Sequence, residues 1–465
     1  MTATTTRNPM TVAVVVAFAF FLENFDGTVI ATALPEMALA FGSTPVELSI
    51  GITAYMLTVA IFISISGWMA DRFGAATIFR GAILLFTVAS VLCGLSQNLS
   101  QFTAARILQG IGGAMMIPVG RLIVLRSVER KDFVRAMSFV TVPSMLGQVL
   151  GPPVGGFITT YFSWQWIFYI NIPIGIIGFA MVSVFIKNFK TEVRTKFDWT
   201  GFILTGISIG SFIYGLDLLV QPDSDLNFVA AFIAVGLIVG AIGVWHARRA
   251  SNSIIDLKLL NIPTFLLILL GGFGFRMTVG AIGFLLPLQM QVGLNMTAFA
   301  SGLLTLFVAV GALLMKTAAS PILRQFGFRN SLLINGSLWL VSIFSFGFFG
   351  VSTSALVIGL VLFMSGIFRA LQFTSINTLA YADVTPSKMS SATSLASTAD
   401  RFAIGVGVSV SAIFLHNVSL VTGSASPLVF NIVFAGVALL ALISIVPFYR
   451  LSRDAGGELS GHVLR

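Results

Sequence analysis

Long apolar runs, separated by short polar or Gly/Pro-containing breaks, account for almost the whole chain. Fourteen can be distinguished, at residues 10–33, 48–69, 78–96, 101–125, 135–160, 165–186, 198–219, 228–247, 264–290, 299–319, 330–350, 353–378, 391–415 and 428–449. A helix needs roughly 20 apolar residues to cross a hydrocarbon core. Only 9% of the residues are charged, whereas a soluble domain typically has about a quarter. We therefore expect an all-α integral membrane protein with 14 transmembrane helices.

The basic residues orient these helices. If the N-terminus is cytoplasmic and successive runs alternate in direction, 20 of the 26 Lys and Arg residues fall in cytoplasmic segments. None is left for an external loop. The positive-inside rule predicts this asymmetry. We expect a multi-pass protein of the bacterial cytoplasmic (inner) membrane with both termini in the cytoplasm. Because the basic residues are spread over many short segments, a nucleic-acid partner is not expected.

A charged stretch at 187–198 suggests a boundary after the sixth run. A weak internal repeat supports two related halves, since Gly67–Gly74 ends the second run and Ser320–Gly327 ends the tenth, both with Phe-Gly at the close. Repeats around a midplane site are common in transporters. We predict a 6+2+6 arrangement: an N-terminal six-helix bundle (1–190), a cytoplasmic linker with two inserted helices (191–258), a C-terminal six-helix bundle (259–450) and a cytoplasmic tail (451–465). The inserted helices are expected to pack peripherally.

Ionisable residues within the first and fourth runs are the candidates for proton coupling, because charges inside a membrane are costly. Glu23 and Asp26 are three residues apart and share one helix face. Two carboxylates this close cannot both ionise cheaply, so we expect the pair to hold a proton as a unit. Arg106 lies at a similar depth to Asp26. The alternative is that one acid is simply fixed as the ion-pair partner of Arg106.

The C-terminal half contains three arginines inside its runs, Arg276, Arg369 and Arg401, with only Asp400 to offset them. Guanidinium groups stay charged when buried, so they are expected to face water, an acid or a ligand in a substrate cavity. Such a cavity favours an anionic or zwitterionic solute, while a cationic or neutral amphiphile stays open. Arg121 and Lys316 lie near cytoplasmic helix ends and are interpreted as structural.

Two glycine-containing motifs are candidates for gating. Gly67, Asp71, Arg72 and Gly74 form a short cytoplasmic turn, where Asp71 could accept hydrogen bonds from a helix N-terminus of the other half. Gly147, Gly151, Pro152 and Gly155, with Pro153 and Gly156, give the fifth run a smooth face and sites for a kink. Their alternatives are a tight polar turn and ordinary helix packing.

Taken together, these motifs resemble the major facilitator superfamily, in its fourteen-helix drug:proton antiporter branch. The matching segments are Asp26–Pro35, Gly67–Gly74, Arg106–Gly113, Gly147–Gly156 and Trp164–Gly175. The resemblance implies that Asp26 and Arg106 take part in proton transfer and that the fifth-run motif favours export. Glu23 departs from the pattern, since relatives often have an amide there. Ala75 and Ala76 replace residues that are often basic, which weakens the expected latch or leaves it to Arg80.

The sequence therefore predicts a proton-coupled efflux transporter (antiporter) of small organic or amphiphilic solutes, multidrug-exporter-like, working by alternating access. The alternatives are a dedicated exporter of an anionic metabolite, a lipid or amphiphile flippase, and uptake by symport. No Ser/His/Asp set, metal-ligand cluster or phosphate-binding loop is evident, so an enzyme is not expected. The expected partners are a small-molecule substrate, protons and the lipid bilayer, with no cofactor, no metal and a monomeric state.

Overall fold

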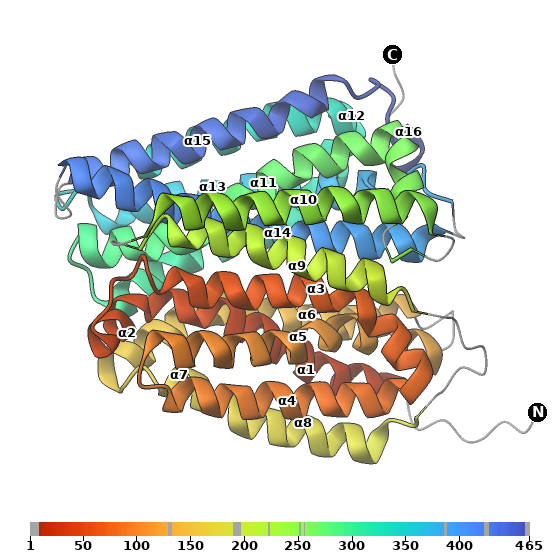
Figure 1. Cartoon of the computed structure of the whole chain (residues 1–465). Coiled ribbons are helices and arrows are strands. Elements are labelled where there is room, and N and C mark those ends of the chain that lie inside the picture. The colour runs from red at the N-terminus through yellow and green to blue at the C-terminus, as the bar shows by residue number, and fades with distance from the viewer. Residues whose placement is uncertain are drawn as a thin grey trace, which may run out of the picture.

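The computed structural model describes residues 9–128, 133–188, 197–221, 224–250, 253–254, 256–385, 388–422 and 427–460. Within these ranges every regular element is a helix (Figure 1). The first part contains α1 (Pro9–Val29), η1 (Ile30–Thr32), α2 (Leu34–Phe41), α3 (Ser49–Phe73), α4 (Ala75–Leu95), α5 (Leu99–Ser127), α6 (Phe133–Tyr161), α7 (Trp166–Tyr169) and α8 (Asn171–Phe185). The middle contains α9 (Trp199–Leu218), α10 (Leu226–Arg249) and η2 (Leu257–Asn261). The last part contains α11 (Pro263–Leu288), η3 (Gln289–Gly293), α12 (Ala298–Phe346), α13 (Ala355–Leu379), α14 (Met389–Thr422), α15 (Pro427–Tyr449) and α16 (Gly457–Ser460).

Twelve helices among the described residues are long and apolar enough to cross a membrane. One of them, α12, has 49 residues and is interrupted at Gly327, whose φ of 71° and ψ of 169° are not helical. Glycine adopts such a positive φ without a steric penalty, so α12 consists of two arms that meet at this residue. The apolar runs 299–319 and 330–350 lie on these two arms, and the run 135–160 lies on the 29-residue α6. The chain is a multi-pass membrane protein.

The helices form two bundles with a helical pair between them. Helices α1 to α8 pack on one another and are called the first bundle, and α11 to α15 are called the second bundle. The pair α9–α10 packs mainly on itself, but α9 also contacts α3 and α14. In Figure 1 α9 lies along the boundary between the bundles. Its Ile213 is buried against Leu57 of α3 and Val406 of α14. This inserted helix therefore covers a seam between the bundles, while α10 lies outside it.

Small residues allow the helices to approach closely. A Cβ atom added to Gly112 of α5 would lie 2.9 Å from Ala82 O of α4, and one added to Gly280 of α11 would strike the Ile404 backbone of α14. Glycine at such positions lets neighbouring backbones meet without a side chain between them, as is usual in membrane bundles. The glycine-rich composition thus serves packing within each bundle.

The bundles also meet at one end of the molecule, which we call the Thr32 end and which carries Thr32, Thr160, Gln291 and Phe299. There Gln291 Nε2 donates to Thr32 O at 3.1 Å. The Phe299 amide donates to Thr160 Oγ1 at 3.0 Å. The opposite end, called the Asp71 end, carries Asp71 and the tip of α12 at Gly327. The described contacts between bundles thus close the Thr32 end.

Candidate functional site

Asp26 and Arg106 form a fully buried ion pair inside the first bundle. Arg106 Nη1 lies 2.7 Å from Asp26 Oδ2, and neither side chain is exposed. Arg106 is also held by contacts from its Nε to Gly51 O at 3.3 Å and from its guanidinium to the face of Tyr55 at 4.2 Å. Burying two charges is costly unless both are paired and hydrogen-bonded. The contacts fix Arg106 in one position.

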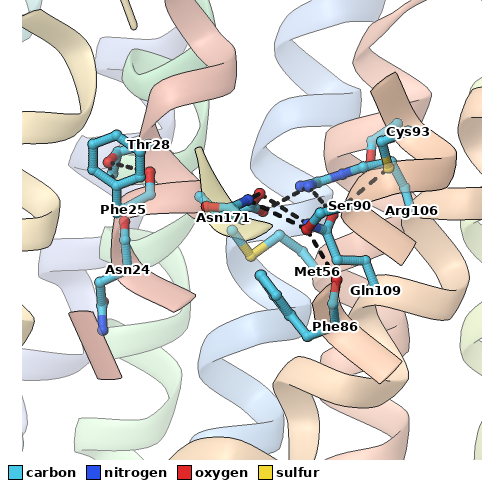
Figure 2. A network of polar contacts seen from close by, with 12 residues as sticks. Asn24, Phe25, Thr28, Met56, Phe86, Ser90, Cys93, Arg106, Gln109 and Asn171 are labelled. Carbon is cyan, nitrogen blue, oxygen red and sulfur yellow. Dashed lines mark hydrogen bonds and ion pairs between the residues drawn. The ribbon is translucent and has the colours of Figure 1, made fainter. Parts of the chain in front are cut away.

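Neutral amides complete the shell around Asp26. Gln109 Nε2 and Asn171 Nδ2 donate to Asp26 Oδ1 at 2.9 and 2.8 Å. Gln109 also donates to Ser90 Oγ at 2.9 Å and accepts from Arg106 Nη1 at 2.5 Å. Figure 2 shows Ser90, Arg106, Gln109 and Asn171 converging from α4, α5 and α8. Asp26 therefore accepts bonds on both oxygens and can exchange a proton only if this network rearranges.

Glu23 makes a different kind of contact, because its partner belongs to the second bundle. Its Oε1 accepts from Arg401 Nη2 of α14 at 3.1 Å. Glu23 is 3% exposed and Arg401 is 24% exposed, so the pair lies at the edge of a partly open space. The second oxygen, Oε2, is buried and has no hydrogen-bond partner. The two acids of α1 thus each pair with a separate arginine, and Asp26 is the acid fixed by Arg106.

The second bundle contains another ion pair beside Arg401. Arg276 Nε lies 2.7 Å from Asp400 Oδ1, and Arg276 Nη2 donates to Asn377 Oδ1 at 2.8 Å. Arg276, Asn377 and Asp400 line a small pocket together with Phe265, Ile268, Leu269, Gly272, Phe273, Ile376, Ala380, Tyr381, Ala396 and Ala399. Asp400 and Arg401 are neighbours in sequence but face different partners, as their roughly 100° separation on a helix requires. The predicted excess of arginines is thus largely offset by acids.

Arg369 remains without such an acid. It is half-buried on α13, and no ion pair links it to another described residue. Phe373, one helical turn further on, lies under the Arg276 guanidinium at 5.1 Å. Because residues four apart share a helix face, Arg369 lies on the side of α13 that faces Arg276.

Arg121 is the residue whose surroundings the sequence did not reveal. Its position near the end of α5 suggested a structural role at the membrane surface. Instead, its exposed side chain lies within electrostatic range of Glu23, Arg401 and Tyr381. It therefore faces the space between the bundles. The other residue interpreted as structural, Lys316 of α12, has its Nζ 2.5 Å from Met145 Sδ of α6 and so also lies between the bundles.

The turn at the Asp71 end has the geometry of a tight polar turn. Gly74 has a φ of +97° between α3 and α4, a conformation that favours glycine. Asp71 pairs with Arg126 of α5 at 2.8 Å, within the same bundle. Arg72 lies over the Trp68 ring at 5.4 Å, and a Cβ added to Gly67 would meet open space. Gly67 therefore makes no close helix contact, and the role of this turn in gating stays a prediction.

The glycines of α6 pack mainly on α1. Cβ atoms added to Gly147, Gly151 and Gly155 would run into Phe21, Thr28 and Val29, whereas one at Gly156 would meet Ala298 and Phe299 of α12. One at Gly302 of α12 would meet the backbones of Pro152 and Pro153. The helix continues through its three prolines. This small-residue face therefore joins α6 to α1 within the bundle and to α12 across the Thr32 end.

Two helical bundles that enclose buried ion pairs within a membrane-spanning fold define a transporter. The chain belongs to the Major Facilitator Superfamily, whose sequence profile matches residues 16–408. It is 35% identical over 446 residues to a Yersinia enterocolitica protein named "Putative multidrug resistance protein MdtD", covering 95% of each chain. The Escherichia coli protein of that name is 36% identical over 451 residues, covering 95% of this chain and 94% of its own. The resemblance seen in the motifs, and the prediction of a transporter instead of an enzyme, are confirmed.

Solved structures share the fold at low identity. The crystal structure of the nucleoside transporter NupG matches with a TM-score of 0.66 and 12% identity over 96% of this chain and all of that one. The D-xylose-proton symporter matches with a TM-score of 0.65 and 14% identity, covering 93% and 96% of the two chains. These likenesses show the fold alone. Among the described residues, no group of three or more His, Cys, Asp or Glu residues could hold a metal ion.

Proposed function

We propose that the protein is a proton-coupled antiporter that exports small organic or amphiphilic solutes by alternating access. The ion pair between Glu23 and Arg401 carries this proposal, because it joins the two bundles at a carboxylate that can take up a proton. Protonation of Glu23 neutralises its charge and weakens its hold on Arg401. Proton uptake is thereby coupled to the relative movement of the bundles.

The direction of coupling follows from competition at this carboxylate. A solute that binds deprotonated Glu23 is displaced when Glu23 takes up a proton, which is the requirement of antiport. Asp26 and Arg106 support the site by holding α1 against α5 through a buried hydrogen-bond network. The relatives named for multidrug resistance agree with export of small solutes.

We further propose 14 membrane-spanning helices arranged 6+2+6, with α6 and both arms of α12 each counted as spans and α9–α10 as the inserted pair. The Asp71 end would face the cytoplasm of a bacterial cell with the protein in its inner membrane, because the basic residues of the sequence gather there. Of these, Arg7, Arg130, Lys131, Lys190, Arg194, Lys196 and Arg465 lie outside the described residues. The bundle boundaries at 190, 258 and 450 and a monomeric state complete the proposal.

In this orientation the Thr32 end is external and closed by α6, α12 and the end of α1. The glycines at 155, 156 and 302 allow that closure. We propose that the Asp71 turn acts when the opposite, cytoplasmic gate closes, with Asp71 exchanging its Arg126 partner for a contact across the bundles.

Everted membrane vesicles that hold a proton gradient, reported by a quenched pH dye, test this function. Anionic, zwitterionic and cationic compounds are added one at a time. Antiport predicts that some of them restore fluorescence with the native protein and fail with Glu23→Gln or Asp26→Asn. Glu458→Gln is the matched control, because Glu458 is an exposed acid of α16. If an unrelated antiporter responds and this protein responds to nothing, broad efflux is wrong.

A dedicated exporter of an anionic metabolite is the second candidate. It is favoured by Arg369 and Arg121, which make no ion pair with another described residue. In that case only anions would restore fluorescence. A flippase would instead change the distribution of a labelled lipid between leaflets. Uptake by symport would carry protons in the same direction as the added solute and so acidify the vesicle lumen, whereas antiport removes protons from it.

A further inference from the structure

The Glu23 carboxylate lacks a donor on one side. Its Oε1 is bonded to Arg401, while Oε2 is buried with no hydrogen-bond partner. A buried, unsatisfied acceptor is costly, and more so when it is charged. The charged and titratable groups around it are Arg401 of α14, Arg121 of α5 and Asp26 of the same helix, with Tyr55 of α3 within range. This oxygen needs a donor that the surrounding side chains do not supply.

Each of the two nearby arginines has guanidinium donors without a strong acceptor. Arg401 Nη1 contacts Met56 Sδ at 3.9 Å, and a thioether is only a weak acceptor. Arg121 makes no hydrogen bond or ion pair with another described residue, although it lies within electrostatic range of Glu23 and Arg401. Guanidinium groups present several donors to a carboxylate or phosphate. These two side chains can therefore receive one acidic group.

The charges of this cluster disfavour solutes with a single charge. Arg276 and Asp400 neutralise each other, which leaves Glu23 facing the two cations Arg401 and Arg121. A plain cation would approach Glu23 against two positive charges. A plain anion would satisfy the arginines but leave Oε2 without a donor, and it would compete with Glu23 instead of with the proton.

We propose that the transported solute is a zwitterion that inserts between Glu23 and the two arginines. Its ammonium group donates to Glu23 Oε2, and its acidic group accepts from Arg401 Nη1 and Arg121. This inference rests on the proposed antiport function, because the ammonium group and the proton then occupy the same carboxylate in turn.

Two sources offer this chemistry, namely a soluble solute of the amino-acid type and a lipid headgroup of the phosphatidylethanolamine type. Matched probe series separate them. The soluble series is L-phenylalanine, phenethylamine and 3-phenylpropionate. The lipid series is lysophosphatidylethanolamine and lysophosphatidic acid. Binding is measured by isothermal titration calorimetry on the purified full-length protein in detergent, with no proton gradient.

In at least one series the zwitterion should bind about tenfold or more tightly than the analogues that lack one of its two charged groups, since each lost charged hydrogen bond weakens binding by about that factor. Glu23→Gln and Arg121→Gln should each weaken zwitterion binding about tenfold, with Arg121→Lys retaining most of it. Arg450→Gln and Glu458→Gln, which change exposed residues, should leave binding unaltered. The series that responds identifies the source.

The zwitterion site would be overturned by equal binding, in both series, of an analogue that lacks one charged group, by absence of binding in both, or by unaltered binding to Glu23→Gln. These outcomes are independent of the vesicle assay, because that assay reports proton movement whatever the charge of the compound that is transported. Proton-driven export can therefore be correct even if the zwitterion site is wrong. Size-exclusion profiles are used to check that each variant is folded.

Discussion

Glu23 of α1 and Arg401 of α14 lie 3.1 Å apart and join the two bundles through an ion pair. Asp26 is three residues further along α1, yet its partner Arg106 belongs to the same bundle as α1 itself. One helix therefore carries an acid that stabilises its own bundle and an acid that holds the other bundle. The Asp26–Arg106 pair is thus enclosed within one bundle, whereas the Glu23–Arg401 pair spans both bundles and borders a partly open space.

The interbundle pair should show strong coupling in a double-mutant cycle. Removing one partner leaves a buried charge unpaired, so Arg401→Gln should destabilise the protein by about 1–3 kcal/mol, less than a fully buried pair because Arg401 is partly exposed. Glu23→Gln combined with Arg401→Gln should recover much of this loss. Unfolding in detergent measures the free energy of unfolding of the single and double variants. If the losses in the two single variants simply add up in the double variant, the pairing is contradicted.

Arg106→Lys should impair transport although it keeps the charge. A lysine cannot hold Asp26 and Gly51 O at once as the guanidinium does. We expect the free energy of unfolding to fall by about 1–3 kcal/mol, the contribution of hydrogen bonds to a charged group. We also expect the vesicle signal to be largely lost. Arg450→Lys, which changes an exposed residue outside this network, is the control. Native-like transport by Arg106→Lys would show that charge alone suffices.

Gly302→Val should open the Thr32 end. A side chain there would collide with the Pro152 and Pro153 backbones of α6, so α6 and α12 could no longer meet. The test labels a cysteine placed at Phe299 with a membrane-impermeant maleimide, in a Cys93→Ser background that removes the one native cysteine. Labelling should increase several-fold. Gly283→Val is the control, because nothing lies within 4 Å of its added Cβ, and unchanged labelling in Gly302→Val would refute this closure.

Asp198, just before α9, should make attachment of the inserted pair sensitive to acid. Burial tends to raise the pKa of Asp198, but hydrogen bonds from Gly201, His246 and Ile254 prevail and hold it below its ordinary value. An acid whose pKa is lowered by folding contributes stability at pH values above its unfolded-state pKa. This contribution is lost as the pH falls through the folded-state pKa.

Asp198→Asn should therefore destabilise the protein at pH 7, by about 0.3–1 kcal/mol for loss of the negative charge at the N-terminus of α9, since asparagine still caps the helix. The difference from the native protein should shrink as the pH falls below about 4, the ordinary range of an aspartate. Unfolding curves recorded from pH 7 to pH 3 check this. A difference that grows at low pH would contradict it.

Asp71→Asn should separate gating from stability. The Asp71–Arg126 pair is largely exposed, and exposed ion pairs contribute about 0–1 kcal/mol. Stability should thus change by no more than that, while transport in vesicles should fall several-fold if Asp71 closes the cytoplasmic gate. Transport that remains at the native rate would leave only the polar-turn interpretation.

The sequence predicted features that depend on local spacing. The helical membrane fold followed from the apolar runs, and a pairing of Asp26 with Arg106 was one of the two alternatives that their similar depth suggested. Gly74 and the small-residue face of α6 occupy the turn and the helix contact that their residue types favour. Each of these depends on one helix or on two neighbouring ones.

Contacts between the bundles could not be predicted in the same way. The pairing of Glu23 with Arg401 joins residues 378 positions apart, and no spacing rule connects them. Within the second bundle, the pairing of Arg276 with Asp400 also joins residues far apart in the sequence, so spacing did not predict it either. Arg121 was interpreted as structural because it lies near a helix end. Its neighbours Glu23 and Arg401 come from α1 and α14, which its position in the sequence does not reveal. The packing of α9 along the seam likewise depends on tertiary structure.

Proton release on solute binding tests the central role of Glu23 most directly. Purified protein in lightly buffered detergent solution is mixed with a compound that was active in the vesicle assay, and a pH dye records the change. We expect native protein and Glu458→Gln to release protons and Glu23→Gln to release none while remaining folded. Proton release that persists in Glu23→Gln, or none from the native protein, would contradict coupling at this carboxylate.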